Sequence, residues 1–295
     1  PPQLSAVSIN QTTGVFSLTA STSASNAGSH TFRVRASDGV RTAVKSTVAS
    51  LSFLPLNGLT GMYDMKDSSS YSGSGSTWTN TSSGAGDDLT IDTSKVTYNS
   101  SGTGGIPSLS LDTGTTSPAI KNGSGTASHA GLTSTTSPYP NTAIMIFNRP
   151  SSVSQTNSIF FASQASLGGA LAFDSNNNLA LRTGSAQTGS WNHAAAQTTA
   201  KFYLNTVDQS SMTQQQLRDF FTNSNNQDKY NSIVVTDGHF YYGWASGNLN
   251  PALPQYALLG EVRALVFYDR VLTATEISGV HAHFASDYSS SDMVQ

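Results

Sequence analysis

The stretch LLGEVRALVFYDRVLTATEISGVHAHFASDY, from Leu258 to Tyr288, contains the clearest fold signal in the chain. Its first half is rich in β-branched and aromatic residues and predicts a strand. One side of this strand is expected to carry Val262, Ala264, Val266 and Tyr268, and the other side Leu265 and Phe267. Because both sides are largely apolar, we expect the strand to lie at the centre of a sheet that is covered on both faces.

The second half of the stretch predicts a helix. Thr273 and Glu276 have the spacing of a capping box, which marks the start of a helix. The positions i, i+3, i+4 and i+7 that follow form one largely apolar stripe that can lie on a sheet: Ile277, Val280, His281 and Phe284. The same capping-box spacing, Thr213 to Gln216 ahead of LRDFF, predicts a second short helix.

The composition excludes several classes of protein. The chain has 295 residues, no cysteine and a net charge of −3, so neither disulfides, thiolate metal sites nor nucleic-acid binding is expected. No apolar run is long enough to span a bilayer, so no membrane insertion is expected. Ser and Thr supply 82 of the 295 residues and charged residues only 31, a balance closer to proteins that work outside cells. The chain begins Pro1-Pro2 without a leader, which predicts a part or a processed form of a longer protein.

Residues 1–54 show the pattern of two β-hairpins. HTFRVRAS alternates apolar and polar residues, and Asp38-Gly39 follows it as a hairpin turn. SINQTTGVFSLTA turns at Thr13-Gly14. This pattern resembles the immunoglobulin-like and cadherin-like repeats of bacterial and phage surface proteins. The resemblance implies an incomplete small sandwich, whose other strands are absent or come from a neighbour. Aspartates bind calcium in such repeats, but the single carboxylate of Asp38 favours a plain turn, so no metal is predicted.

Pro55 and Gly58 interrupt the strand pattern, so we expect residues 55–60 to be a linker, 61–290 one large domain and 291–295 a tail. The large domain reads as many short strands, including GLTGMYDM, NTAIMIFNRP and SIFFASQ, with Trp78 in TWTN after the first of them. These segments and the closing GEVRALVFYDR strand with its helix resemble the concanavalin A-like, laminin-G-like jelly rolls. The resemblance implies a last strand beside the first and a helix over the end. The expected fold class is all-β: an incomplete immunoglobulin-like sandwich followed by a jelly roll with two short helices.

The carboxylates do not predict an ordinary glycosidase. Such enzymes need two carboxyl groups about 5 to 9.5 Å apart. The chain has only two glutamates, of which Glu276 is explained by its capping box and Glu261 has no acidic partner on its strand face. Asp87 and Asp88 are adjacent and would point to opposite sides of a strand. We also expect no metal pair from His281 and His283, because they cannot share a helix face, and we predict neither catalytic residues nor a cofactor.

Two loop-like segments could bind a sugar. GSWNHAAAQ and DGHFYYGWASGNLN combine aromatic rings, which stack on sugar C–H surfaces, with amide and imidazole groups for the hydroxyls. The candidate glycan-binding residues are Trp191, Asn192, His193, Tyr241, Trp244 and Asn248. The alternative is that these aromatic residues pack in the core or within the loops, because HFYYGW must bury at least one of its faces.

Taken together, the sequence predicts a non-enzymatic, surface-exposed structural or adhesive protein. The pairing of modules resembles fibre, decoration and appendage proteins of phage virions, and also bacterial cell-surface or secreted adhesins that bind carbohydrate. The expected partners are other copies of the chain or neighbouring structural proteins, and also cell-surface glycans. The expected place is the virion surface or the extracellular cell surface. The alternative from another class is a polysaccharide-degrading enzyme with an atypical site.

Overall fold

The computed structural model describes the chain in segments, which together contain most of the strands and the C-terminal helix. They are residues 4–10, 12–13, 16–20, 28–37, 39–51, 54–83, 88–94, 96–111, 120–122, 142–148, 158–162, 169–173, 179–183, 201–209, 223, 225–226, 228–236 and 260–294. The second expected helix, at 213, lies outside these residues.

The centre of the fold is an eight-stranded antiparallel sheet with the order β16-β15-β17-β11-β18-β9-β8, in which β5 also pairs with β18. Its strands are β5 (Leu59–Asp64), β8 (Val96–Asn99), β9 (Ser108–Leu111), β11 (Thr142–Asn148), β15 (Lys201–Leu204), β16 (Val207–Asp208), β17 (Tyr230–Thr236) and β18 (Gly260–Tyr268). The strands expected from GLTGMYDM, NTAIMIFNRP and GEVRALVFYDR are therefore confirmed as β5, β11 and β18.

The C-terminal strand β18 lies in the interior of this sheet. It pairs along one edge with β11, and along the other with β5 near its end and with β9 near its start. Strands that lie more than 110 residues apart in sequence are thereby joined. The last strand does lie beside the first strand of the large domain, as the resemblance implied.

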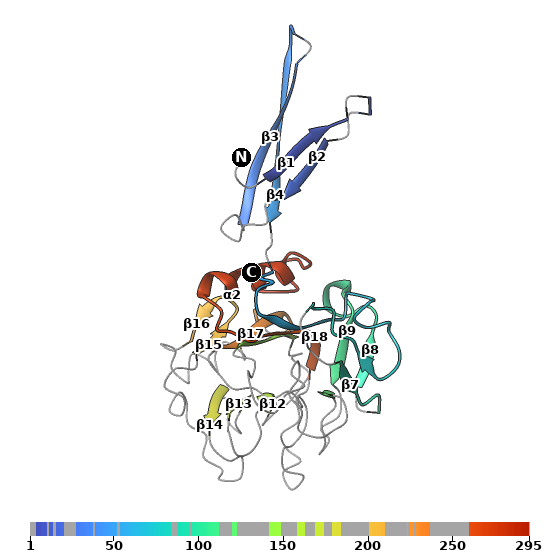
Figure 1. Ribbon diagram of the computed structural model, residues 1–295, viewed down its shortest axis with the longest axis vertical. Coiled ribbons are helices and arrows are strands. Elements are labelled where there is room, and N and C mark those ends of the chain that lie inside the picture. Colours follow the sequence, from blue (N-terminus) through green and yellow to red (C-terminus); the bar gives the residue numbers. More distant parts are fainter. Residues whose placement is uncertain are drawn as a thin grey trace.

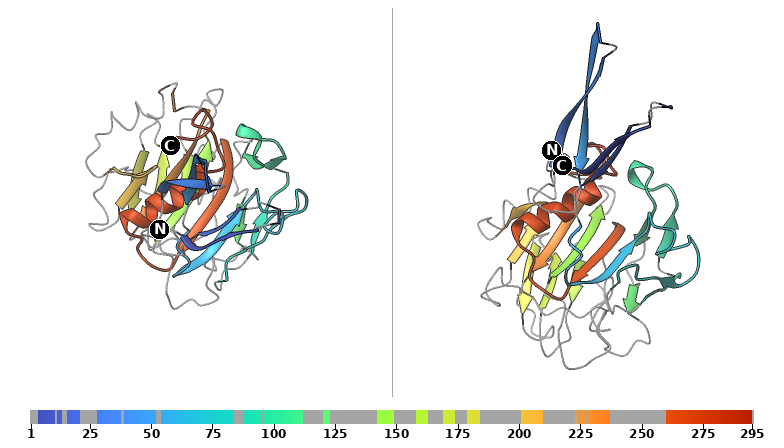
Figure 2. Two further views of the ribbon diagram at one scale, coloured as in Figure 1. Left: turned by 90° about the horizontal axis from the view of Figure 1, so that it is seen from above. Right: turned by 45° about the horizontal axis from the view of Figure 1, so that its top comes forward.

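The layers are arranged with helix α2 (Ala274–Ala285) on one side of the main sheet and a smaller sheet on the other (Figure 1, Figure 2). The smaller sheet consists of β12 (Ser158–Ala162), β13 (Gly169–Phe173) and β14 (Leu179–Thr183) in that order. A further sheet has the order β10-β7-β6, from β6 (Thr77–Trp78), β7 (Leu89–Ile91) and β10 (Ile120–Asn122). One 3-10 helix, η2 (Thr103–Gly105), precedes β9. The predicted all-β sandwich is confirmed, with one α-helix in the described part.

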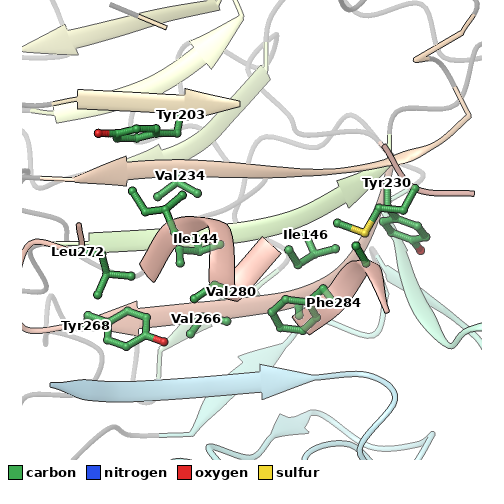
Figure 3. Packing of buried hydrophobic residues seen from close by; sticks show 14 of the residues in the cluster. Ile144, Ile146, Tyr203, Tyr230, Val234, Val266, Tyr268, Leu272, Val280 and Phe284 are labelled. Atoms are coloured by element: carbon green, nitrogen blue, oxygen red, sulfur yellow. The ribbon is translucent and has the colours of Figure 1, made fainter. Parts of the chain in front are cut away.

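The helix-facing side of the main sheet forms a hydrophobic cluster. Figure 3 shows side chains from β11, β17 and β18 meeting Val280 and Phe284 of α2. All four residues of the predicted helix stripe are at most 4% exposed, which confirms the expected orientation of α2. Every residue of β11 and β17 is buried, so this sheet is covered on both faces.

The opposite side of the sheet is built around aromatic rings. The Tyr63 ring of β5 makes edge contacts with Trp78 of β6 and Phe267 of β18, with ring centroids 5.8 and 6.2 Å apart. All three side chains are at most 1% exposed. Tyr63 therefore packs between Trp78 and Phe267, and Phe267 is buried on the side away from the helix, as expected for a core position.

A β-bulge in β18 changes which residues share a face. Ile146 pairs with Ala264, but the next residue, Phe147, pairs with Val262, so Arg263 is an extra residue in the ladder. The extra residue shifts the alternation of side chains by one position. Ala264 belongs to the helix-facing cluster, and Val262, although fully buried, does not. The expectation that Val262 shares a face with Ala264 was wrong, because strict alternation cannot anticipate a bulge.

The start of β18 needs a residue without a side chain. Gly260 has φ +141, and a Cβ there would lie 2.5 Å from the Asn148 carbonyl oxygen and 2.7 Å from the Phe147 ring. Any larger residue would push β18 away from the end of β11. Close approach of the two strands thus depends on this glycine.

The N-terminal residues form two separate hairpins. β1 (Leu4–Ile9) pairs with β2 (Phe16–Ala20), and β3 (Gly28–Ser37) pairs with β4 (Thr42–Leu51) over ten residues each. Both predicted hairpins are confirmed, and in the second the chain reverses between Ser37 and Thr42, with Gly39 at φ +90. Each hairpin is a two-stranded sheet of its own, and both lie beyond the helix side of the large domain (Figure 1).

Candidate functional site

The bulge places a charged residue in the interior. Arg263 is 0% exposed and donates two hydrogen bonds to the Asp64 carboxylate, from Nε and Nη2, each 3.1 Å long. Its Nη2 also donates to Asp287 at 2.5 Å, and the guanidinium lies 5.1 Å from the Phe284 ring centre and 5.0 Å from that of Tyr288. The arginine thus joins the first strand of the domain to the residues that follow α2.

The electrostatics of this group keep Arg263 and Asp287 charged. Burial by itself would lower the pKa of Arg263, but the adjacent Asp64 carboxylate raises it above its usual value. Burial would raise the pKa of Asp287, yet hydrogen bonds from Lys66 and Arg263 hold it below its usual value. A buried group of compensated charges of this kind holds structural elements in place and offers no proton near neutral pH.

Glu261 lies on the helix-facing side of the same strand. Its Oε2 accepts hydrogen bonds from the Tyr230 hydroxyl at 3.0 Å and the Thr103 hydroxyl at 3.1 Å. Asn148 donates to the same Thr103 oxygen at 3.0 Å. Burial raises the pKa of Tyr230, so its hydroxyl stays protonated and is a poor nucleophile. The hydrogen bonds of Glu261 with Thr103 and Tyr230 therefore connect η2, β17 and β18.

Glu276, the other glutamate, closes the N-terminus of α2. Its carboxylate accepts from the Thr273 backbone N–H at 2.9 Å, while the Thr273 hydroxyl accepts from the Glu276 N–H, which confirms the predicted capping box. Arg270 donates two further hydrogen bonds to it, at 2.6 and 3.0 Å. These bonds from Arg270, against the opposing effect of burial, lower the pKa of Glu276 to about 2. Nε of Arg270 donates to the Asn57 carbonyl oxygen at 2.8 Å, so the same arginine fixes the entry of the chain into the large domain.

One buried serine–histidine pair lies between α2 and the sheet. The Ser232 hydroxyl lies 2.8 Å from Nδ1 of His281 and donates to the Asn205 carbonyl oxygen at 3.2 Å. Ser232 is 0% exposed and His281 4%, so neither can meet a substrate. Burial lowers the pKa of His281, which stays neutral. His283 lies against the Phe284 ring, away from this pair.

Neither a metal centre nor a membrane span is found in the described part of the chain. No group of three His, Asp or Glu side chains there is arranged to hold a metal ion. No helix among those residues is long and apolar enough to cross a membrane. The structure thus brings the acidic residues into pairs with donors instead of into a metal-binding group.

The predicted glycan-binding residues are not among those that the structure describes. Trp191, Asn192, His193, Tyr241, Trp244 and Asn248 all lie outside the described segments, as does Asp87. The proposed sugar platform therefore stays a prediction. Asp88 accepts a hydrogen bond from the Asn80 backbone N–H at 2.9 Å, in keeping with the turn role expected for it.

The sequence reasoning missed the Arg263 group and the packing of the C-terminus. The signal for the first was an arginine within the apolar run EVRALVFY, which a regular buried strand does not tolerate. At the C-terminus, Met293 is 0% exposed and forms a parallel bridge with Tyr230, whose N–H donates to the Asp292 carbonyl oxygen at 2.7 Å. The final residues thus add a short segment beside β17.

Comparison with known proteins gives a distant structural likeness. No protein-family model and no curated protein matches the chain. Among solved structures, it is similar to Trypanosoma rangeli sialidase in complex with the inhibitor DANA, with 14% identity, a TM-score of 0.46 and coverage of 80% of this chain and 34% of that chain. A mutant of the same sialidase displaying trans-sialidase activity matches with 14% identity and a TM-score of 0.42, over 82% of this chain and 35% of that one.

The chain spans about a third of the length of these sialidase chains. At this identity and TM-score the likeness is one of distant structure, and no specific function follows from it. The class of protein that fold and packing define is a β-sandwich with a helix-covered central sheet, and its function must be argued from its own residues.

Proposed function

We propose that this chain is a non-catalytic, surface-exposed structural or adhesive protein, of the kind that forms appendages on virions, with glycan binding as an additional capacity. A bacterial cell-surface or secreted carbohydrate-binding adhesin is the alternative of the same class. A jelly roll whose C-terminal strand lies in the interior of its main sheet, and whose hairpins extend beyond its helix side (Figure 1), suits a module that holds a position and presents a surface.

The observation that carries the proposal is the engagement of both glutamates of the chain. Glu276 is held by Thr273 and Arg270, and Glu261 by Tyr230 and Thr103. Acid–base cleavage of a glycosidic bond needs one carboxyl group with a raised pKa and a second one a short distance away, both facing the sugar. Glu276, with its pKa lowered to about 2, cannot serve as the acid, and Glu261 contacts hydroxyl donors instead of a second carboxylate.

Incubation with a polysaccharide panel tests the absence of catalysis. The full chain is incubated with laminarin, agarose, alginate and a sialylated oligosaccharide, and the reducing ends released are measured over a day. We expect no release above that of a Glu261→Gln variant. Sustained release of reducing ends by the wild type that disappears in Glu261→Gln would contradict the proposal and favour a polysaccharide-degrading enzyme.

The place of the protein is tested separately by electron microscopy. Gold-labelled antibodies against the chain should decorate the surface of native particles or cells. Labelling confined to the cell interior would contradict a surface role, whatever the result of the polysaccharide assay.

A further inference from the structure

The β3–β4 hairpin is an exposed ribbon. Its described side chains at and near the turn are all exposed: Thr31, Arg33, Arg35, Ala36, Ser37 and residues 39–46. Val40 is 91% and Val44 59% exposed, values far above those of any core residue. Among the described strands, β3 and β4 pair only with each other, so each has an edge that no other described strand covers. Such an edge and two open faces are surfaces that a partner can cover.

The ribbon is basic. Arg33, Arg35, Arg41 and Lys45 lie within 13 residues, and Asp38 is the one acidic residue among them. Arg33 and Arg35 are two positions apart on β3, so they share a face about 7 Å apart. Val44 is paired with Arg35 across the ribbon and lies on that same face. The face therefore combines two guanidinium groups with an exposed apolar side chain.

The rest of the chain has the opposite charge. The chain has 14 basic and 17 acidic residues, and residues 1–54 hold four of the basic and one of the acidic ones. Residues 55–295 therefore carry 10 basic and 16 acidic residues, a net charge of −6 against +3 for residues 1–54. A charge division of this size within one chain favours contact between the two parts in different molecules.

Within one copy the turn of the ribbon points away from the large domain (Figure 1, Figure 2). Figure 1 and Figure 2 show the β3–β4 turn at the end of the molecule farthest from the main sheet. Contact between two such ribbons is disfavoured, because their edges would bring like charges together. The large domain of another copy, with its net charge of −6, has the charge that complements the ribbon.

We propose that the β3–β4 ribbon of one copy docks through Arg33 and Arg35 on the acidic large domain of a second copy, in a head-to-tail contact. This inference rests on the proposed structural role and names its partner. A contact between two different surfaces does not close on itself in a pair, so repetition gives chains or rings. Because its charges are exposed, the contact weakens with salt.

Sedimentation velocity on the full chain tests the contact. In about 0.05 M NaCl, where screening is weak, the average mass should rise with protein concentration, and in about 0.5 M NaCl it should fall back towards one copy. The Arg33→Glu/Arg35→Glu variant should associate at least about tenfold more weakly at low salt, because two attractions become repulsions. Arg33→Lys/Arg35→Lys, which keeps the charge, should retain most of the association.

The matched control reverses the same number of charges on the large domain. Lys201→Glu/Lys229→Glu makes that domain more acidic and should leave association unchanged or strengthen it. Equal loss in both reversed variants, or association that ignores salt, would overturn the docking surface. The thermal midpoints of the arginine variants should equal that of the wild type, since Arg33 and Arg35 are exposed. The midpoint of the lysine control should fall only slightly, because it loses the exposed contacts of Lys201 with Asp208 and of Lys229 with the Ser290 carbonyl oxygen.

A mixing experiment identifies the head-to-tail geometry. The Arg33→Glu/Arg35→Glu variant keeps an intact acidic domain, so in excess it should bind the free ribbon at chain ends and shorten wild-type assemblies. Unchanged assemblies would contradict the geometry. A wild type that stays a single copy at low salt but binds dextran sulfate beads would also overturn the proposal, in favour of an anionic polysaccharide as the ribbon's partner. Failure of either kind leaves the catalytic assay, and hence the proposed function, untouched.

Discussion

The β18–α2 region and the β3–β4 hairpin use similar residue types for opposite purposes. Both contain apolar residues and arginines on extended strands. In β18, Arg263 is 0% exposed and paired with two carboxylates, and Phe267 is 1% exposed. In the hairpin, Arg33 and Arg35 are exposed, and so is Val44. The type of residue alone does not decide what it does. An arginine in β18 joins elements of the core, whereas the arginines in β3 present their charge to solvent.

The difference follows from what covers each strand. β18 has β11 on one edge, β5 and β9 on the other, and α2 over one face. In the hairpin each strand has one neighbouring strand among those described, and no described residue covers the faces near the turn. Substitutions in the first region should therefore change folding stability, and those in the second should change association alone. Matched pairs of variants can test this division.

The largest effect is expected from Phe267→Ala. Removing the ring leaves a cavity beside Tyr63 and should lower the free energy of unfolding by about 4 kcal/mol. Val44→Ala on the hairpin should change it by no more than about 0.5 kcal/mol. Urea midpoints of the two variants provide the measurement. Equal midpoints would mean that β18 is peripheral.

Arg263→Ala should cost about 3 kcal/mol. The substitution leaves the Asp64 and Asp287 carboxylates without their shared partner in a buried site, which is more costly than losing an exposed pair. Arg33→Ala on the hairpin removes the same side chain at an exposed position and should be neutral within about 0.5 kcal/mol. If both variants unfold at the wild-type denaturant concentration, the buried group contributes nothing.

Glu276→Ala should cost about 2 kcal/mol. The cap alone accounts for about 1 kcal/mol, and the two hydrogen bonds from Arg270 add to it because the pair is well aligned and only partly exposed. Thr275→Ala, one residue away on the exposed side of α2, is the control and should have little effect. A Glu276→Ala midpoint equal to that of the control would show that the cap and ion pair do not stabilise α2.

The smallest expected effect is a loss of folding stability as the pH falls. Burial lowers the pKa of His281 below its usual value of about 6.5, so the unfolded state binds more protons than the folded state as the pH falls below that value. The contribution of this residue to stability should therefore decrease as the pH falls from 7 to 5. The loss linked to Glu276 has its own window, between about pH 4.5 and pH 2.

His281→Gln removes the titrating group and should flatten the decrease between pH 7 and pH 5, measured by urea midpoints at each pH. His283, whose pKa is also lowered by burial, keeps a residual slope in this variant. A slope as steep as that of the wild type would exclude His281 as a source of the acid sensitivity.

Much of the fold was predictable from local patterns. The capping box of α2, its apolar stripe and the central place of β18 follow from spacing and from apolar residues on both strand faces. The bulge was not predictable, because a single extra residue leaves the local alternation readable in two registers. The partners of Arg263 come from β5, 199 positions before it, and from the residues after α2, 24 positions beyond it, so no local pattern contains them. The predicted glycan-binding residues lie outside the described segments and stay a prediction.

Native-state hydrogen exchange tests most directly the claim that β18 is the centre of the fold and the β3–β4 turn an exposed surface. Amides of Leu265 and Val266, which lie in the interior of the main sheet, should exchange only through global unfolding, with the full free energy of unfolding. Amides near the hairpin turn, such as those of Arg35 and Val44, should exchange with a far smaller free energy and respond little to Phe267→Ala. Fast exchange in β18, or protection of the hairpin turn at the global level in a single copy, would contradict the account.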